Sequence, residues 1–173
     1  MPNIVLVRID NRLIHGQVAT MWSAVTGANL LLVANDAVAT DEFRQGLMNM
    51  AAPAYAQTRF FSIEKTCAII DKASPAQKSA IICETPQDVL RLKKGGVPIT
   101  KVNIGNMHMA EGKRQVATSV AVDDADVAAF KELQDLGCEL EIKRVPDTAA
   151  EDISKLFKSE FKLNSLERRN TWI

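Results

Sequence analysis

The sequence predicts an α/β protein in which a mainly parallel open sheet of about six to seven strands carries helices on both faces. Two observations lead to this fold class. Short apolar runs rich in β-branched residues alternate with amphipathic stretches almost from one end of the chain to the other. Most of these runs are apolar along their whole length, as strands are when both faces of a sheet are covered.

A change in apolar spacing separates the first strand from the first helix. Residues 3–9 (NIVLVRI) form a short β-branched run, so they are expected as a strand. Residues 15–25 show helical spacing, and Gly27 follows as the C′ residue that ends the helix. The apolar stripe of this helix consists of Val18, Met21, Trp22 and Val25.

The second strand is expected over residues 29–34 (NLLLVA). Either Asp36 or Thr40 caps the helix that follows. That helix runs towards Met50 and ends before Pro53, because a residue ahead of proline avoids the helical conformation. The apolar side chains of this helix that are expected in the core are Leu47, Met48 and Met50.

Two further pairs of strand and helix follow. Residues 58–61 form the third strand, and Ser62 caps a helix over residues 64–72. Residues 79–83 form the fourth strand. The next helix starts with Thr85 as its cap, followed by a proline and by an acidic residue in the first turn.

The alternation continues towards the end of the chain. Residues 101–104 form the fifth strand, and residues 115–122 give one or two short strands. Asp123 or Asp124 caps a helix that runs to Leu136.

The last elements are a strand over residues 139–145, where polar and apolar side chains alternate, and a helix over residues 151–158. No internal repeat or low-complexity linker interrupts the chain, so residues 1–158 are expected to form a single domain. Residues 159–173 form a charged C-terminal tail that the pattern leaves unassigned.

The composition argues against several classes of function. The 173 residues carry 21 Lys and Arg against 21 Asp and Glu, and this balance offers no footprint for nucleic acid. Cys67, Cys83 and Cys138 lack a CxxC spacing, so reduced, structural cysteines are expected. No window approaches 18 apolar residues and the N-terminus has the pattern of a strand, so we expect a cytoplasmic protein.

In a sheet of this kind, ligands bind beyond the carboxyl ends of the strands, where the strand order changes direction. That rule selects the loops at residues 10–17, 35–36, 84–86 and 105–108. Both histidines of the chain, His15 and His108, fall in these loops. We therefore expect the functional site at this edge of the sheet.

The loop after the first strand has the parts that phosphoryl transfer needs. The imidazole of a residue such as His15 is largely neutral at cytoplasmic pH, so one ring nitrogen is a nucleophile. Arg8 and Arg12 carry guanidinium groups that match phosphate oxygens in pairs. His15 also stands where a helix begins, and the free N–H groups there favour an anion. Asp10 is expected to hydrogen-bond the imidazole and fix its tautomer.

Two other functions stay open from the residues alone. A metal-dependent hydrolase would take its ligands from His15, His108 and either Asp10 or Asp36. The chain has no close ligand pair such as HxH or HExxH, so we expect no metal. A non-catalytic regulatory module would dock partners through the same face and keep His15 as a phosphorylation signal.

Residues 8–18 (RIDNRLIHGQV), with Trp22 four residues on, form a distinctive run around a histidine. This run resembles the signature of the IIB component of mannose/fructose/sorbose-class sugar phosphotransferase systems. The resemblance covers roughly residues 1–157, through residues 34–36, 59–61, 103–108 and 145–146. Asn11 stands where many members have aspartate. The stretches 105–108 and 111–113 look most like the N-acetylgalactosamine/galactosamine-specific branch.

The resemblance implies a protein-N(pi)-phosphohistidine–sugar phosphotransferase that needs no cofactor. Such proteins accept a phosphoryl group from the IIA component on the histidine that matches His15. They pass it to a sugar held by the membrane components IIC and IID, so the chain is expected to associate peripherally with a membrane permease. Arg8 and Arg12 are then expected to bind the phosphate. The residues expected to support the site are Asp10, Gln17, Asn35, Thr85 and His108.

Overall fold

The structure, a computed structural model, describes residues 1–158. Six strands form one sheet in which every neighbouring pair is parallel, in the order β3-β2-β4-β1-β5-β8. They are β1 (Asn3–Asp10), β2 (Leu30–Ala34), β3 (Gln57–Phe61), β4 (Lys78–Cys83), β5 (Lys101–Asn106) and β8 (Glu139–Ile142). β6 (Arg114–Ala117) and β7 (Val120–Val122) pair antiparallel in a separate hairpin. The α/β fold with a mainly parallel open sheet is confirmed, and the tail over residues 159–173 lies outside the described residues.

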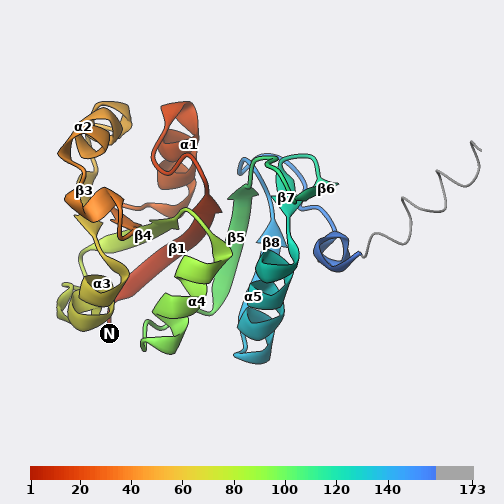
Figure 1. Ribbon diagram of the computed structural model, residues 1–173. Helices are drawn as coiled ribbons and strands as arrows, with labels where there is room; N and C mark the ends of the chain where they lie inside the picture. Colours follow the sequence, from red (N-terminus) through yellow and green to blue (C-terminus); the bar gives the residue numbers. More distant parts are fainter. Residues whose placement is uncertain (159–173) are drawn as a thin grey trace, which may run out of the picture.

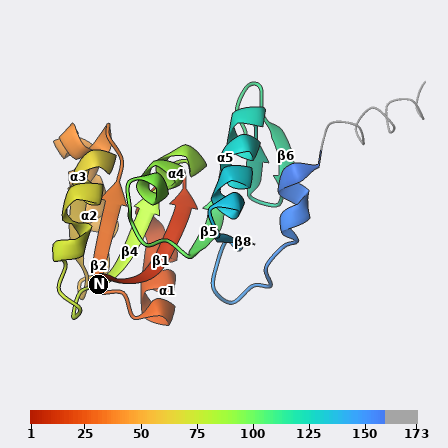
Figure 2. The same ribbon diagram turned by 90° about the horizontal axis from the view of Figure 1, so that it is seen from below.

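Helices cover both faces of the sheet (Figures 1 and 2). α1 (Gly16–Thr26) and α2 (Glu42–Ala51) pack on one face. On the other face lie α3 (Ile63–Ile69), α4 (Pro86–Lys94) and α5 (Asp124–Asp135). The chain moves from β1 outward to β3 and then returns through β4 to β5 and β8, so right-handed crossovers put the two groups of helices on opposite faces. The direction of the strand order therefore reverses around β1.

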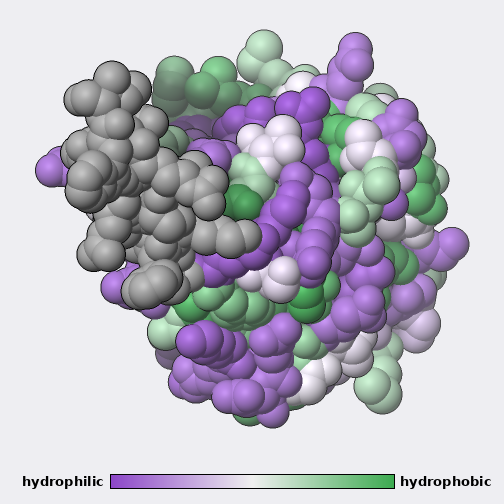
Figure 3. All heavy atoms as spheres, turned by 90° about the vertical axis from the view of Figure 1, so that its right-hand side faces the viewer, coloured by the Kyte–Doolittle hydropathy of each residue, from purple (hydrophilic) through white to green (hydrophobic). Residues whose placement is uncertain are grey.

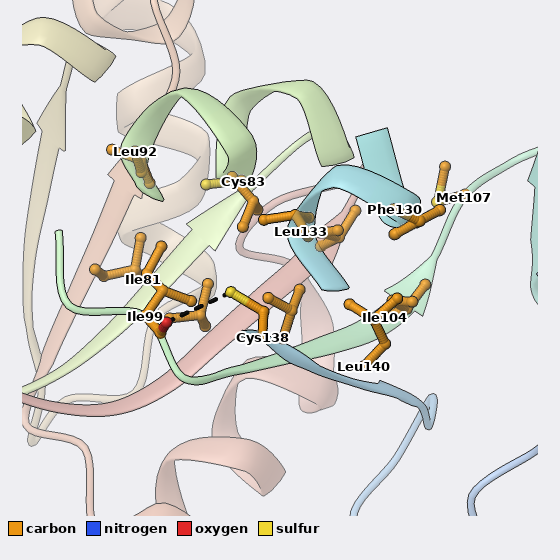
Figure 4. Packing of buried hydrophobic residues seen from close by; sticks show 14 of the residues in the cluster. Ile81, Cys83, Leu92, Ile99, Ile104, Met107, Phe130, Leu133, Cys138 and Leu140 are labelled. Atoms are coloured by element: carbon orange, nitrogen blue, oxygen red, sulfur yellow. Dashed lines mark hydrogen bonds between the residues drawn. The ribbon is translucent and has the colours of Figure 1, made fainter. Parts of the chain in front are cut away.

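The larger core lies between the sheet and the helices α3, α4 and α5. Figure 4 shows Phe130 and Leu133 of α5 beside Ile104 of β5, and all three side chains are fully buried. Burying one such side chain contributes about 1.5–3 kcal/mol. Cys138 lies in the same core, where its thiol donates to the carbonyl oxygen of Ile99 at 3.4 Å. All three cysteines are free thiols.

The face of β5 and β8 that points away from α5 carries polar side chains. Lys101 and Asn103 alternate with buried apolar residues along β5, and Glu141 does the same on β8. Lys101 Nζ lies 2.9 Å from Glu141 Oε2 on this face. No α-helix of residues 1–158 packs on this part of the sheet, and a pocket beside α1 is lined there by residues that include Trp22, Lys101 and Glu141.

Local signals placed most helix starts correctly. Three expected caps accept a hydrogen bond from the backbone N–H three residues on, namely Ser62, Thr85 and Asp123. The expected cap of α2 is wrong, because Asp41 caps that helix in place of Asp36 or Thr40. A short 3-10 turn, η1 (Val38–Thr40), precedes α2 and delays its start.

The buried sides of α1 and α2 differ from the expected ones. The residues that α1 buries are Ala19, Trp22 and Ser23. Val25, expected in the apolar stripe, is 68% exposed. Met48 of α2 is buried as expected, but Leu47 and Met50 are 53% and 84% exposed. In the described part of the chain, α1 and α2 are the α-helices on this face, so their outer sides have no neighbouring helix to pack on.

The last elements are shorter than expected. β8 ends at Ile142, where the alternating pattern had predicted a strand to residue 145. The helix predicted over residues 151–158 is a 3-10 helix, η3 (Ile153–Phe157).

On the side of the molecule that carries α5 and the β6–β7 hairpin, hydrophilic and hydrophobic side chains are interspersed (Figure 3). Within residues 1–158, every helix is too short or too polar to cross a bilayer.

Asp126 joins the β6–β7 hairpin to α4 and α5. Its carboxylate accepts hydrogen bonds from Gln87 Nε2 and Lys113 Nζ, both at 2.9 Å. It also completes a capping box with Asp123. Burial works against its ionised form, but these hydrogen bonds lower the pKa of Asp126 below its usual value.

We expect Asp126→Ala to lower the free energy of unfolding by about 2 kcal/mol at neutral pH, because two partners and a cap are lost. A carboxyl whose pKa is lowered by folding stabilises the protein above its unfolded pKa. That contribution is lost as the pH falls through the folded pKa, so the difference between variant and parent should shrink in acid. Urea unfolding at pH 7 and in acid measures both effects.

Asp124→Ala is the matched control. Asp124 lies in the same turn of α5, and its side chain is 100% exposed. We expect a change within about 0.5 kcal/mol. Equal effects of the two substitutions would contradict the role assigned to Asp126.

Candidate functional site

The loop between β1 and α1 lies where the strand order reverses. The chain leaving β1 turns to the face of α1, while the chain leaving the neighbouring strand β4 goes to α4 on the opposite face. The loop is fixed to the end of β5, because Asn11 N donates to Asn106 O at 3.1 Å. The side-chain amide of Asn106 also donates to Asn11 Oδ1. This is the position at which open parallel sheets bind their ligands.

Two residues give the loop its tight path. Leu13 has a positive φ of 59°, and its N–H donates to Asp10 O at 2.9 Å. A left-handed conformation costs a non-glycine residue about 1–2 kcal/mol. Burial of the Leu13 side chain, which is 3% exposed in the core under α1, offsets that cost. Gly16 then has a φ of 44° where the helix begins.

This path presents His15 as the N-cap residue of α1. Its side chain is 24% exposed, and Nδ1 lies 3.2 Å from Leu13 O and 3.9 Å from Asp10 Oδ2. Nε2 is buried and has no hydrogen-bond partner among the described residues. The contact with Asp10 is longer than a hydrogen bond, so the Leu13 carbonyl is the nearer partner of the ring.

The N-terminus of α1 differs from those of the other α-helices described. α1 has neither a side-chain cap nor an acidic residue in its first turn, whereas α2, α3, α4 and α5 have both. Its first N–H groups have no side-chain acceptor and no nearby carboxylate of the helix to offset the positive end of the dipole. An anion bound at His15 would accept hydrogen bonds from these N–H groups and would offset the positive end of the dipole.

Asp10 is the buried centre of the site, with an exposed fraction of 0%. Its Oδ1 accepts from the backbone N–H of Arg12 at 3.0 Å and from Arg12 Nε at 3.3 Å. Its Oδ2 accepts from Arg8 Nη2 at 3.1 Å. The carboxylate therefore fixes both the turn of the loop and the direction in which the Arg12 side chain leaves it.

Arg8 occupies a different place from the one expected of a phosphate ligand. It is 3% exposed, and its Cζ lies 5.3 Å from the centre of the Trp22 ring. Nη1 donates to Asn103 Oδ1 at 2.6 Å. The backbone of Gly105 passes so close that a Cβ there would lie 2.0 Å from Arg8 Cζ. Burial lowers the pKa of Arg8, and the charges of Arg12 and Arg144 add to that effect while Asp10 opposes it.

The burial and the contacts of Arg8 argue against a direct role in binding phosphate. Both terminal nitrogens already donate to protein acceptors, and the guanidinium is enclosed by protein. Its chemistry is that of a buried counter-ion for Asp10.

Arg12, in contrast to Arg8, keeps the tip of its side chain open to solvent. Its side chain is 42% exposed. One nitrogen, Nε, is engaged with Asp10, and the two terminal nitrogens have no hydrogen-bond partner in residues 1–158. A guanidinium that is held at its base and open at its tip is suited to binding phosphate oxygens in pairs.

The other predicted residues form no hydrogen bond with His15 within residues 1–158. Gln17 is exposed in the first turn of α1, and His108 is exposed just after β5. Thr85 caps α4. Asn35 is 5% exposed and donates to Glu84 Oε2 at 2.9 Å, so it joins the ends of two strands. Asn35 and Thr85 thus have structural contacts of their own.

One segment was missed by the sequence reasoning. Lys143 and Arg144 follow β8 at the same edge of the sheet, and their backbone carbonyls accept hydrogen bonds from Arg8. The rule that selected the other loops applies to this strand as well. The alternating pattern continues to residue 145, so it hides the point at which this strand ends.

Comparisons with known proteins agree on one family. Residues 4–167 match the model of the PTS system sorbose subfamily IIB component. The chain is 49% identical over 156 residues to the N-acetylgalactosamine-specific phosphotransferase enzyme IIB component 2 of Escherichia coli, covering 90% of this chain and 99% of that one. It is 41% identical over 141 residues to the mannose-specific EIIAB component of the same species, covering 81% of this chain and 44% of that one.

Solved structures have the same fold. The crystal structure of the N-acetylgalactosamine-specific IIB component 1 from Escherichia coli superposes with a TM-score of 0.85. It is 47% identical in sequence and covers 87% of this chain and 99% of that one.

Proposed function

Because the chain belongs to the sorbose subfamily of the IIB components of sugar phosphotransferase systems, we propose that His15 is the residue on which it carries the phosphoryl group. A IIB component is a phosphotransferase that receives a phosphoryl group from a IIA component and transfers it to a sugar. The observation that supports His15 is its position at the uncapped N-terminus of α1, beside Asp10 and the open guanidinium of Arg12.

In the transfer, the bond from phosphorus to a histidine nitrogen of the donor breaks and a bond to a nitrogen of His15 forms. Nδ1 is the N(pi) position that the resemblance implies, so the ring would react as the tautomer that carries its proton on Nε2 and has a free lone pair on Nδ1. The phosphoryl group on Nδ1 would then replace the contact between Nδ1 and Leu13 O. Arg12 and the N–H groups of α1 would bind the phosphate oxygens. Asp10 would hold Arg12, and Arg8 would hold Asp10. Such a site catalyses by positioning and by compensating charge.

IIB components work with IIA and with membrane components IIC and IID. We propose that this chain lies in the cytoplasm, where it docks with the IIA component and associates peripherally with the permease formed by IIC and IID. The name of the 49% identical relative supports a system for N-acetylgalactosamine. The stretches 105–108 and 111–113 support the same branch.

The experiment is to mix the protein with a phosphorylated IIA component of an N-acetylgalactosamine system. We expect one acid-labile, alkali-stable phosphoryl group per chain, located by peptide mapping at His15. Membranes that hold IIC and IID should then discharge it onto N-acetylgalactosamine. A label on His108 or on no histidine would refute the assignment of His15. A phosphorylated protein that never discharges to a sugar would instead have the regulatory role considered above.

Arg12→Ala tests the phosphate-binding role. A charge-assisted hydrogen bond contributes roughly 1.5–3 kcal/mol, and each 1.4 kcal/mol is about tenfold in rate. Solvent exposure reduces the upper limit, so we expect transfer to slow by about 10- to 100-fold. Arg12→Lys should recover part of the rate, because an ammonium restores the charge without the paired donors.

Transfer kinetics in both directions, at two salt concentrations, measure the effect of Arg12→Ala. The loss should be larger at low salt, where exposed charges are less screened. An alanine variant as fast as the parent at low salt would remove Arg12 from the phosphate site.

A further inference from the structure

Two consecutive carbonyl groups after β8 are held beside the candidate site. Lys143 O accepts from Arg8 Nη1 at 3.2 Å and from Asn103 Nδ2 at 3.1 Å. Arg144 O accepts from Arg8 Nη2 at 3.0 Å and from Trp22 Nε1 at 3.1 Å. Four donors from β1, β5 and α1 thus fix a segment that has no regular secondary structure. A backbone held so firmly places the base of the Arg144 side chain at a defined point.

That point is adjacent to Asp10. One nitrogen, Arg8 Nη2, donates both to Asp10 Oδ2 at 3.1 Å and to Arg144 O at 3.0 Å. Asp10 Oδ2 in turn lies 3.9 Å from His15 Nδ1. A single guanidinium nitrogen therefore connects the main chain of Arg144 with the carboxylate beside the reactive ring.

The side chain of Arg144 is exposed and has no ion pair or hydrogen bond with residues 1–158. After burial, the charges of Arg12 and Arg144 are the causes that lower the pKa of Arg8, and Asp10 is the one carboxylate that raises it. Arg8 and Arg12 thus donate to one buried carboxylate, and the main chain of Arg144 is held against Arg8, in a chain whose total charge is zero.

We propose that Arg144 is a second phosphate-binding residue, which together with Arg12 encloses the phosphoryl group on His15. The inference rests on the proposed role of His15. A phosphoryl group brings about 1.5–2 negative charges at pH 7. With Asp10, those charges balance the three arginines, of which Arg8 is buried as the counter-ion of Asp10. Arg144 thus supplies the second cation that Arg8, being enclosed, does not.

The test compares Arg144→Ala and Arg144→Lys with the parent. Transfer from phospho-IIA should slow by about 5- to 30-fold in the alanine variant and partly recover in the lysine variant. A ³¹P NMR titration of the phosphorylated protein reports on the phosphate itself. Loss of a nearby positive charge should raise the second pKa of the phosphoryl group by about half a unit. A residue that only shaped the loop would not move that titration.

Arg59→Ala is the matched control, because Arg59 is an exposed arginine on the edge strand β3. It should change neither the rate nor the titration. An Arg144→Ala variant with the parent's phosphate titration would overturn the proposal, whether or not transfer is slower. A parent protein that takes up no phosphoryl group at His15 would refute the proposed function itself, and the two failures are therefore distinguishable.

Discussion

Replacing His15 with alanine is expected to abolish phosphoryl uptake and leave the fold intact. The phosphoryl group needs a nucleophilic nitrogen, and alanine has none. The stability should change by no more than about 0.5 kcal/mol, because the side chain is partly exposed and makes no capping hydrogen bond. Labelling from phospho-IIA measures the first effect, and urea unfolding measures the second.

His108→Ala is the matched control for His15→Ala. His108 is the other histidine of the chain, and it is exposed at the same edge of the sheet. The His108→Ala variant should accept the label on His15 to the same stoichiometry as the parent. Full labelling of the His15→Ala variant would transfer the carrier role to another residue, and loss of label in both variants would indicate that His108 takes part.

The elements could be predicted where the signal is local. The caps Ser62, Thr85 and Asp123 each bond an N–H three residues on, so the necessary partners are neighbours in sequence. The predicted cap of α2 was wrong for a physical reason. Asp36, an equally good capping type, is used elsewhere: it accepts from Ile63 N and from Arg91, and both partners are distant in sequence.

In the candidate site, too, the residues that are neighbours in sequence could be predicted, and the long-range contacts could not. Asp10, Arg12 and His15 lie within six residues of one another, and the loop after a parallel strand brings them together. The place of Arg8 depends on long-range structure. Its terminal nitrogens reach carbonyls more than 130 residues away, over a strip of sheet that no described helix covers. Spacing along the chain contains no information on such contacts, and so Arg8 was expected at the phosphate.

The enclosure of Arg8 makes Gly105 the most sensitive glycine of the site. A Cβ at this position would lie 2.0–2.2 Å from three atoms of the Arg8 guanidinium. That group has no room to move, because it is buried and bound to Asp10, Asn103 and the segment after β8. We expect Gly105→Ala to displace Arg8 and to lower the free energy of unfolding by about 3–5 kcal/mol, as happens when one partner of a buried ion pair is lost.

Gly46→Ala is the control for Gly105→Ala, and Arg8→Ala supplies the mechanism. Gly46 lies inside α2 with no atom within 4 Å of its Cβ position, so alanine there should stabilise the protein by about 0.5–1 kcal/mol. In an Arg8→Ala background the clash partner is gone, and the cost of Gly105→Ala should fall below about 1 kcal/mol. Urea unfolding of the four members of this cycle measures the coupling. A Gly105→Ala cost that is equally large without the arginine would show that the clash lies elsewhere and that Arg8 does not depend on Gly105.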